Sequence, residues 1–398
     1  MSPPAPDLRR VVAVLSLSQV VSWGCLYYGF AALQSSITRD TGWSATAVTA
    51  AFSLSQLVSG AVGLWVGRHL DARGPRLVMT GGALLAAPGM LLVAAAPSLP
   101  WFFVGWLVVG TAMAGTLYPS AFAAVTRWGG EQRVRALTTV TLAGGLASTV
   151  FAPLAAVVDA IAGWRTAYVV LAGVALVVTV PLHWWGLDRP WPEAPRRQAC
   201  DPPDGDRVVR TRPFLLLAAA TTLAALAGFA VVVNLVPMLR EQGFDTRTAA
   251  VVLGLGGLGQ VLGRLGYPRF ASATGVTARG VWILAAMAVL TAALALAPAE
   301  TTVVVVLSLV LGLARGLFTL VQATSVTDRW GPAAYGRLNG VLTAPALAAS
   351  AASPFAGALL ATVTGSYTAA FLVLAGVAGL GALLFIGAAP TRRAPTPR

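Results

Sequence analysis

The hydrophobic residues of this chain fall into twelve long runs, separated by short segments that contain charged residues, proline or glycine. A run of about 20 apolar residues can cross the hydrocarbon core of a bilayer as one helix. The pattern therefore predicts an all-α, polytopic membrane protein with twelve transmembrane helices. These helices are expected at residues 11–36, 45–67, 76–96, 101–126, 136–159, 166–186, 213–238, 247–268, 279–297, 303–326, 338–361 and 369–388.

The segment 187–212 interrupts this pattern with six arginines, five acidic residues and five prolines. Such a composition is typical of a polar linker. It divides the chain into an N-terminal six-helix bundle at 1–186 and a C-terminal six-helix bundle at 213–398. Arg9 and Arg10 precede the first run as they would in a signal peptide. No convincing cleavage site follows, so the first helix is expected to be retained.

The overall composition supports the membrane assignment. Hydrophobic residues make up 57% of the chain and charged residues 10%, whereas soluble domains contain about 25% charged residues. A soluble chain of this length would form two or three domains with polar surfaces, which this composition excludes. All 27 basic residues are arginine, and glycine and proline are abundant; this usage is typical of a GC-rich bacterial genome.

The net charge of +13 comes from arginines that gather in one set of connections. With the N-terminus inside, 21 arginines lie in the termini, the linker and the inner connections, and four lie on the opposite side. Two more, Arg264 and Arg315, lie within predicted helices. The positive-inside rule then places both termini and the linker in the cytoplasm, with the bilayer of a bacterial inner membrane around the helices. Because the arginines form no single soluble face, nucleic acid is not an expected partner.

Short motifs recur about 200 residues apart, which indicates an internal duplication. The paired motifs are 42–44 (Gly-Trp-Ser) with 243–245 (Gly-Phe-Asp), and 127–129 with 329–331 (both Arg-Trp-Gly). In the first pair, Ser44 and Asp245 are each a good N-cap for the helix that follows. Arg135 and Arg337 are also 202 residues apart. Two parallel six-helix repeats with a solute site between them are a known transporter architecture.

The connection after the second predicted helix reads Gly-Arg-His-Leu-Asp-Ala-Arg-Gly-Pro-Arg at 67–76. It resembles the signature of the major facilitator superfamily (MFS), although Ala72 stands where that family often has arginine. The glycines suit a close helix contact and a tight turn, and the acid can pair with an arginine or cap a neighbouring helix. The resemblance implies an MFS fold and a conformational gate formed by Gly67, Asp71, Arg73, Gly74 and Arg76.

Other residues resemble the monocarboxylate and oxalate–formate exchanger branch of that superfamily. They are Trp23-Gly24, the Gly-Pro-Arg sequence at 74–76, the stretch 127–137 and the glycine pair 144–145. The Gly-Pro pattern that marks drug–proton antiporters in the fifth helix is absent. The resemblance implies alternating access, with a central cavity lined by the first, fourth, seventh and tenth helices.

Arg315 lies near the middle of the tenth predicted helix, and Thr319 and Gln322 follow on the same helical face. An arginine at the bilayer centre costs about 2.5–3.5 kcal/mol on insertion scales, so a functional reason is expected. Arg315 either binds the solute or bonds structurally to a neighbouring helix. Arg264 is near the end of the eighth helix, where the resembled exchangers place an anion-binding arginine. Arg264 either takes part in binding the anion or in gating, or its long side chain extends to the membrane interface. The eleventh helix has no basic counterpart, which argues against oxalate itself.

The first helix carries a stripe of aromatic and amide side chains at helical spacing: Gln19, Trp23, Tyr27, Phe30 and Gln34. Such stripes are commonly packing surfaces, but the two glutamines favour a face that lines a wet cavity.

Tyr118 in the fourth helix and Asn234 in the seventh are further candidate substrate contacts, and Pro119 is expected to kink its helix. Trp43, Trp101 and Trp164 stand at the ends of predicted helices. They are expected to be interfacial anchors.

The acidic residues lie in loops or tails, apart from Asp159, which is expected to pair with Arg165. Two histidines and two cysteines in different segments predict no metal site, no cofactor and no disulfide. A cavity that holds arginine without an acid has a positive potential, which a low dielectric strengthens. Arginine also binds carboxylates through two parallel hydrogen bonds, so an anionic solute is expected.

The sequence thus predicts a secondary active transporter that moves a small organic anion by alternating access. Monocarboxylates are the candidate class of anion. The alternative within the transporter class is efflux of neutral or amphipathic compounds. A membrane enzyme needs acids, histidines or cysteines gathered at depth, and a sensing receptor usually adds a long soluble segment, so neither is expected. A coupling proton or a counter-anion stays open as the second partner.

Overall fold

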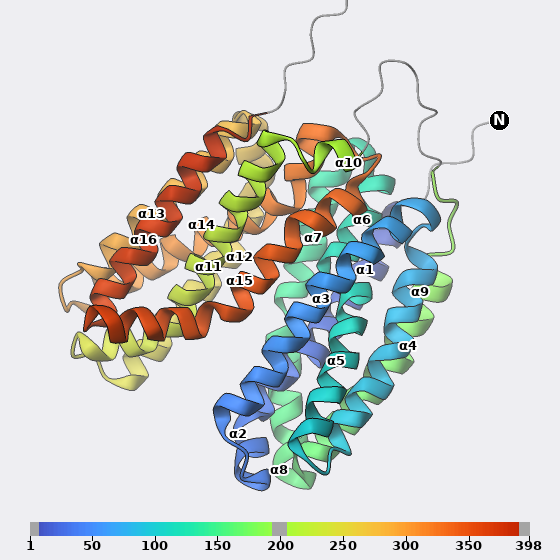
Figure 1. Ribbon diagram of the computed structural model, residues 1–398, viewed down its shortest axis with the longest axis horizontal. Coiled ribbons are helices and arrows are strands. Elements are labelled where there is room, and N and C mark those ends of the chain that lie inside the picture. The colour runs from blue at the N-terminus through green and yellow to red at the C-terminus, as the bar shows by residue number, and fades with distance from the viewer. Residues whose placement is uncertain (1–7, 193–204, 390–398) are drawn as a thin grey trace, which may run out of the picture. The chain divides into compact units, whose positions relative to one another are not determined.

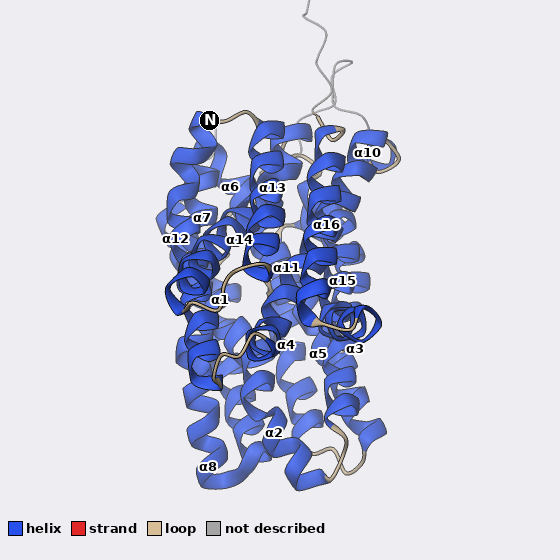
Figure 2. Ribbon diagram, turned by 90° about the vertical axis from the view of Figure 1, so that its left-hand side faces the viewer, coloured by secondary structure: helices blue, strands red, loops and turns tan. Residues whose placement is uncertain are grey.

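In the computed structural model, residues 8–192 and 205–389 are described, and every regular element within those ranges is a helix (Figure 2). Internal packing divides the chain into two units. The first unit contains Met1–Arg197 and Ala333–Ala351, and the second contains Gln198–Pro332 and Ala352–Arg398. Helix α15 (Tyr335–Thr364) therefore contributes its first half to the first unit and its second half to the second.

The remaining helices follow the chain order through each unit (Figure 1). Those of the first unit are α1 (Leu8–Trp23), the π-helix η1 (Gly24–Tyr28), α2 (Gly29–Thr41), α3 (Ala45–Arg73), α4 (Pro75–Ala94), α5 (Leu99–Thr116), α6 (Tyr118–Gly129), the 3-10 turn η2 (Gly130–Gln132), α7 (Arg133–Gly145), α8 (Ala147–Val174), the π-helix η3 (Ala175–Thr179) and α9 (Val180–Gly186). Those of the second unit are α10 (Gly205–Val208), α11 (Arg212–Glu241), α12 (Thr246–Ala273), α13 (Val276–Ala295), α14 (Thr301–Trp330) and α16 (Tyr367–Ile386).

Each of the twelve predicted runs is helical over most of its length in the described chain, which confirms the all-α membrane fold. Some of the runs are divided between two helices. The extended backbone of Leu117 separates α5 from α6, directly before the turn that contains Pro119. Gly163, with φ 80° and ψ 163°, breaks α8 at the connection between the fifth and sixth predicted helices. The predicted boundaries at 186 and 213 stay a prediction, because the linker residues 193–204, Cys200 among them, lie outside the described residues.

Both predicted N-caps are confirmed. Ser44 and Asp245 each accept a hydrogen bond from a backbone N–H three residues later, at 3.2 and 3.0 Å. Gly42 and Gly243 precede them with φ angles of 71° and 94°, a left-handed conformation that glycine adopts without strain. The duplicated motif therefore ends one helix and starts the next in both halves of the sequence.

The same duplication is visible where helices pack. A Cβ atom on Gly110 of α5 would lie 2.8 Å from Ser55 Cα of α3. A Cβ atom on Gly312 of α14 would lie 2.8 Å from the carbonyl carbon of Gly256 in α12. Gly312 is 202 residues beyond Gly110, and Gly256 is 201 beyond Ser55. Small residues allow helix backbones to approach closely in membranes, so small residues at corresponding positions set similar contacts in the two units.

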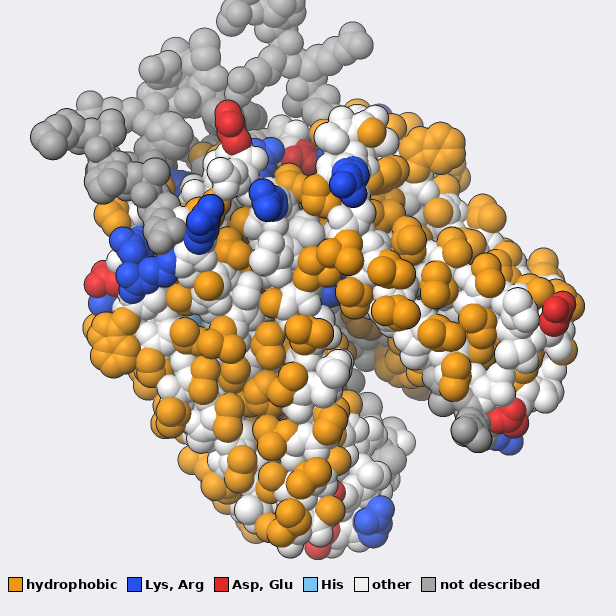
Figure 3. Space-filling view, turned by 180° about the vertical axis from the view of Figure 1, so that it is seen from behind, with side chains coloured by type: hydrophobic (Ala, Val, Ile, Leu, Met, Phe, Trp, Pro, Cys, Tyr) orange, Lys and Arg blue, Asp and Glu red, His pale blue; other side chains and the backbone are white. Residues whose placement is uncertain are grey.

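The sides of the helices expose large apolar side chains: Ile161 is 81% exposed, Val363 75% and Trp282 67%. In Figure 3 hydrophobic side chains cover these sides, and charged side chains lie toward the helix ends. With adjoining helices taken together, nine helical stretches of the described chain are long and apolar enough to cross a membrane. Lipid is the solvent in which such a surface is stable.

Two local predictions were wrong. Trp164 is not an interfacial anchor, because it is only 3% exposed and its indole N–H donates to Asp40 at 2.9 Å. Asp159 does not pair with Arg165. It accepts a hydrogen bond from Ser36 Oγ at 2.5 Å, and Arg165 donates to a backbone carbonyl of α4. Trp101, at 53% exposed, does lie on the surface as an anchor would.

Candidate functional site

The polar face predicted on the tenth helix lies along the middle of α14. Arg315 comes fourteen residues after the first residue of this helix and fifteen before its last. Arg315, Thr319 and Gln322 are all half-buried, while the positions between them are mostly buried. Thr319 donates its hydroxyl to the carbonyl of Arg315 at 3.1 Å, so the proton of this hydroxyl is held by its own helix. The Arg315 guanidinium lies beside α11 at Gly228, where an added Cβ would be 3.7 Å from Nε.

Arg264 is buried, at 7% exposed, and its position follows from a close contact between α12 and α14. A Cβ atom on Gly263 would lie 2.9 Å from the carbonyl carbon of Leu313, and one on Gly316 would lie 2.9 Å from that of Gln260. Arg264 thus directly follows one contact glycine, and Arg315 directly precedes another. Both arginines that the sequence places within predicted membrane helices are therefore sequence neighbours of glycines that bring α12 and α14 together.

Asn234 lies at a helix contact rather than on an open face. Its side-chain amide donates to the carbonyl of Ala230 one turn earlier at 2.9 Å, and the residue is 4% exposed. Its carboxamide also packs on Gly357 of α15, where a Cβ atom would be 2.8 Å from Asn234 Cγ.

In the first unit the predicted stripe on the first helix divides into two parts. Gln19 is fully buried and donates to the carbonyl of Thr116 at 2.7 Å. Gln34 donates to the hydroxyl of Thr49 at 2.6 Å. Both glutamines therefore join helices of the first unit, whereas Trp23 and Tyr27 are half-buried.

Trp23 and Tyr27 belong to a continuous aromatic cluster on α1, η1, α3 and α6. The Trp23 ring centroid lies 5.2 Å from that of Tyr27 and 5.0 Å from that of Tyr118. The sequence analysis missed Tyr28, 5.4 Å from Tyr27, and Phe52, 5.1 Å from Tyr27. Tyr28 was missed because the π-helix η1 changes the spacing of side chains by one residue, and π-bulges frequently occur at functional sites. Phe52 was missed because it lies on a different helix, α3, whose contact with Tyr27 is tertiary.

The predicted gate motif brings Asp71 against the start of α15. Asp71 Oδ1 accepts from the backbone N–H of Gly336 and Oδ2 accepts from that of Arg337, both at 2.8 Å. These N–H groups belong to the first turn of α15, where no helical carbonyl is available to them. Of the two contacts expected for Asp71, the structure therefore contains the helix cap, and the carboxylate also complements the positive end of the helix dipole.

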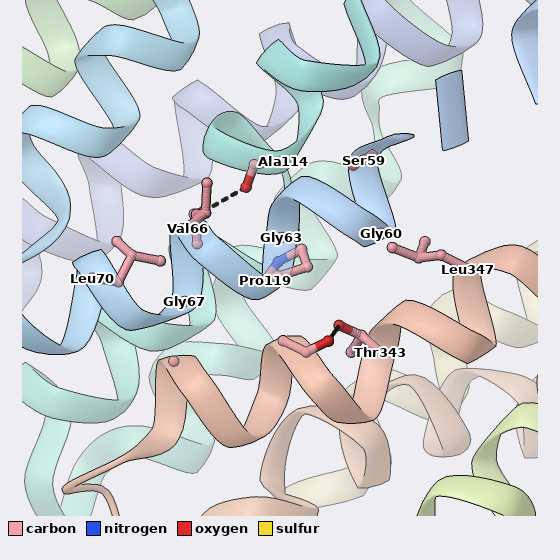
Figure 4. A pocket seen from close by; sticks show the side chains of 13 residues that line it. Ser59, Gly60, Gly63, Val66, Gly67, Leu70, Ala114, Pro119, Thr343 and Leu347 are labelled. Atoms are coloured by element: carbon pink, nitrogen blue, oxygen red, sulfur yellow. Dashed lines mark hydrogen bonds between the residues drawn. The ribbon is translucent and has the colours of Figure 1, made fainter. Parts of the chain in front are cut away.

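Glycine makes this contact possible. A Cβ atom on Gly67, one turn before Asp71, would lie 2.7 Å from the carbonyl carbon of Gly336. Figure 4 shows Gly67, Gly63 and Gly60 of α3 facing Thr343 and Leu347 of α15 across a narrow cavity. Pro119 closes another side of this cavity. All of these residues belong to the first unit.

The remaining gate residues have separate roles in the fold. Gly74 ends α3 with φ 79°, which explains why glycine is required at this turn. Arg76 forms an ion pair with Asp188 at 2.6 Å and donates to the carbonyl of Trp184 at 2.9 Å. Arg73 is exposed. Within the described ranges, no three histidine, cysteine or acidic side chains come together as metal ligands would.

The comparison with known families is decided by a match over most of the chain: residues 15–304 match the Major Facilitator Superfamily. The chain belongs to this superfamily. Its MFS relatives include monocarboxylate transporter 13 of Bos taurus, 29% identical over 346 residues, which are 82% of this chain and 79% of that protein. The oxalate:formate antiporter of Oxalobacter formigenes is 26% identical over 251 residues, or 62% of this chain and 57% of that protein.

Solved MFS structures have the same fold. The human organic anion transporter MFSD10 superposes with a TM-score of 0.77 at 18% identity, covering 96% of this chain and all of that chain. The E. coli fucose:proton symporter superposes with a TM-score of 0.73 at 14% identity, covering 96% and 98%. The predicted MFS fold and the resemblance to the monocarboxylate and oxalate–formate branch are confirmed. The protein is an MFS transporter with multiple membrane-spanning helices, and its relatives are transporters rather than enzymes.

Proposed function

We propose that this MFS protein is a secondary active transporter for a small organic anion, with monocarboxylates as the leading class, and that Arg315 binds the anion. The observation that carries the proposal is the position of Arg315, half-buried at the midpoint of a 30-residue apolar helix. A charge at this depth is costly, so an arginine there has a function or a firm structural role.

The chemistry of arginine favours an anion. Its planar guanidinium presents paired N–H groups that match the two oxygens of a carboxylate. A low dielectric strengthens that attraction. Relatives named as a monocarboxylate transporter and an oxalate:formate antiporter support the same class of solute.

Arg264 is the second cationic group in the proposal, as a binding or gating residue. Because Gly263 and Gly316 hold α12 and α14 together, a movement of one helix is transmitted directly to both arginines. In the proposal Thr319 offers an acceptor and Gln322 both a donor and an acceptor beside Arg315. Asn234, buried against α15, would reach a substrate only if α11 and α15 move apart.

On the first unit we assign substrate contact to the aromatic cluster around Trp23, Tyr27 and Tyr118, with Gln19 and Gln34 fixing the helices that carry it. Aromatic rings with polar ends suit the apolar body of a carboxylate. The same cluster also favours the alternative function, efflux of neutral or amphipathic compounds. Resistance profiling of an overexpressing strain distinguishes the two, because the efflux function predicts broad resistance and the anion function predicts none.

The gate in the proposal is the contact between Asp71 and the start of α15, which breaks and re-forms during each transport cycle. The arginine distribution supports an orientation with both termini cytoplasmic, and the composition supports a bacterial inner membrane. The second transported partner is either a proton or a counter-anion. A pH jump drives uptake in the first case, and internal unlabelled substrate accelerates uptake in the second.

The test is uptake of labelled carboxylates into proteoliposomes. Arg315→Ala is expected to lower the ratio kcat/KM about 100-fold, since truncating one partner of a buried charge pair costs about 2–5 kcal/mol. Arg315→Lys retains the charge and loses the two-pronged geometry, so it is expected to recover part of the activity. Arg269→Ala, at an exposed position on α12, is the matched control. Unchanged uptake by the Arg315→Ala protein refutes the site.

A further inference from the structure

The first residues of the linker lie on the gate motif and do not extend away from it. Asp188 is the ion-pair partner of Arg76 at 2.6 Å. The carbonyl of Pro190 accepts from the Trp128 indole N–H at 3.1 Å, and the carbonyl of Pro192 accepts from Arg127 at 2.9 Å. Three separate anchors therefore fasten a segment of five residues, 188–192, to α4 and to the end of α6.

Trp191 is the centre of this segment. Its indole N–H donates to the backbone carbonyl of Asp71 at 3.1 Å. Its ring lies edge-on to the ring of Trp128, with centroids 5.2 Å apart, and beneath the guanidinium of Arg127 at 5.5 Å. The ring also covers Gly74, where a Cβ atom would lie 3.0 Å from it. Trp191 thus touches the gate acid, the turn after it and the end of α6.

Arg127 connects this segment to the other side of the gate. One of its terminal nitrogens donates to Pro192 and the other donates to the carbonyl of Ala333 at 2.7 Å. Ala333 stands two residues before the start of α15. The linker segment therefore holds Asp71 from one side and, through Arg127, the N-terminal end of α15 from the other.

We propose that residues 188–192 form a clasp and that Trp191 is a positioning residue, which holds Asp71 where its carboxylate caps α15. Opening of the gate then requires the linker to release the motif. The pattern fits this role better than that of a passive tether. A tether needs no fixed contacts with the bundle, whereas this segment has hydrogen bonds to three different helices of the first unit, α3, α4 and α6. The inference rests on the proposed gating role of Asp71.

The experiment measures how fast a maleimide labels a cysteine placed in the cavity of Figure 4 by Thr343→Cys. The background carries Cys200→Ser. The native Cys25, 1% exposed in the core of the first unit, is kept as an internal reporter of unfolding. Asp71→Asn, which weakens the cap, is the positive control for gate opening.

Trp191→Ala is expected to raise the labelling rate at position 343 about tenfold, the shift that about 1.4 kcal/mol of lost stabilisation produces, while the Cys25 rate stays unchanged. Trp191→Phe keeps the ring on Gly74 and loses the N–H, so its rate is expected between those of the wild type and Trp191→Ala. Trp185→Ala removes a tryptophan of the same region that is 62% exposed, and it is expected to leave both rates unchanged.

The outcomes separate the clasp from the gate. If Asp71→Asn raises labelling at position 343 and Trp191→Ala does not, the clasp is refuted and the gate stands. If Asp71→Asn has no effect, the gate itself is refuted. A parallel rise at Cys25 in the Trp191→Ala protein shows a general loss of packing and also refutes the positioning role.

Discussion

Gly67→Ala tests whether the cap on α15 depends on the close approach of two backbones. The added methyl would lie 2.7 Å from the carbonyl carbon of Gly336, whereas non-bonded carbon atoms are stable at about 3.5–4.0 Å. The obstructing atoms are backbone, so no side-chain rotation relieves the overlap. The two helices must separate by about 1 Å.

That separation determines the magnitude. The hydrogen bonds from Gly336 and Arg337 to Asp71 would lengthen from 2.8 Å to about 3.8 Å, beyond the range of a hydrogen bond. Hydrogen bonds to a charged group contribute about 1.5–3 kcal/mol each. Because the two bonds are only partly buried, the lower value applies to each, and about 3 kcal/mol is lost in total. The equilibrium of the gate shifts by about 100-fold toward the open form.

The assay is the labelling rate of the cysteine introduced by Thr343→Cys, together with the melting temperature of the purified protein. Gly63→Ala is the matched control, since it lies one turn earlier on α3 and its added methyl meets nothing within 4 Å. The Gly63→Ala protein is expected to label like the wild type. Equal labelling rates for the Gly67→Ala and Gly63→Ala proteins would show that the glycine contact does not control the gate.

Two further predictions concern packing within each unit. Gly263→Ala places a methyl 2.9 Å from the carbonyl carbon of Leu313, so it is expected to lower the melting temperature by several degrees and to weaken carboxylate binding. In the Gly266→Ala protein the added methyl meets nothing within 4 Å, so its melting temperature and carboxylate binding are expected to stay unchanged. Equal melting curves for the Gly263→Ala and Gly266→Ala proteins would contradict the role of the α12–α14 contact. Trp164→Phe removes the 2.9 Å bond to Asp40 and is expected to cost about 1–3 kcal/mol of unfolding free energy; an unchanged denaturation midpoint would show that the bond contributes nothing.

The local features of the fold were predictable because they depend on neighbouring residues. Apolar runs of sufficient length predict membrane helices, and Ser44 and Asp245 predict helix starts, since an N-cap hydrogen bond spans only three residues. The kink before Pro119 is of the same kind. These predictions depend on composition and on hydrogen bonds within one helix, which the sequence shows directly.

The candidate site was predictable only in part. The sequence placed Arg315, Thr319 and Gln322 on one face, and the structure keeps them half-buried there. It did not show that Gln19 is fully buried against Thr116. Amphipathic spacing identifies a polar side chain on a helix face, but the neighbouring helix decides whether that face is open or closed.

By itself the sequence determined the all-α membrane fold, because insertion into lipid and helix formation follow from local composition. It also predicted a duplicated frame of twelve helices with two arginines inside them. Only the tertiary structure decided that Asp71 caps a helix 265 residues further along the chain. The same holds for Trp191, which covers the turn at Gly74. These contacts depend on which helices pack together. That choice comes from the fit of glycine-lined surfaces and from unsatisfied N–H groups far apart in the sequence, and neither leaves a pattern in any single segment.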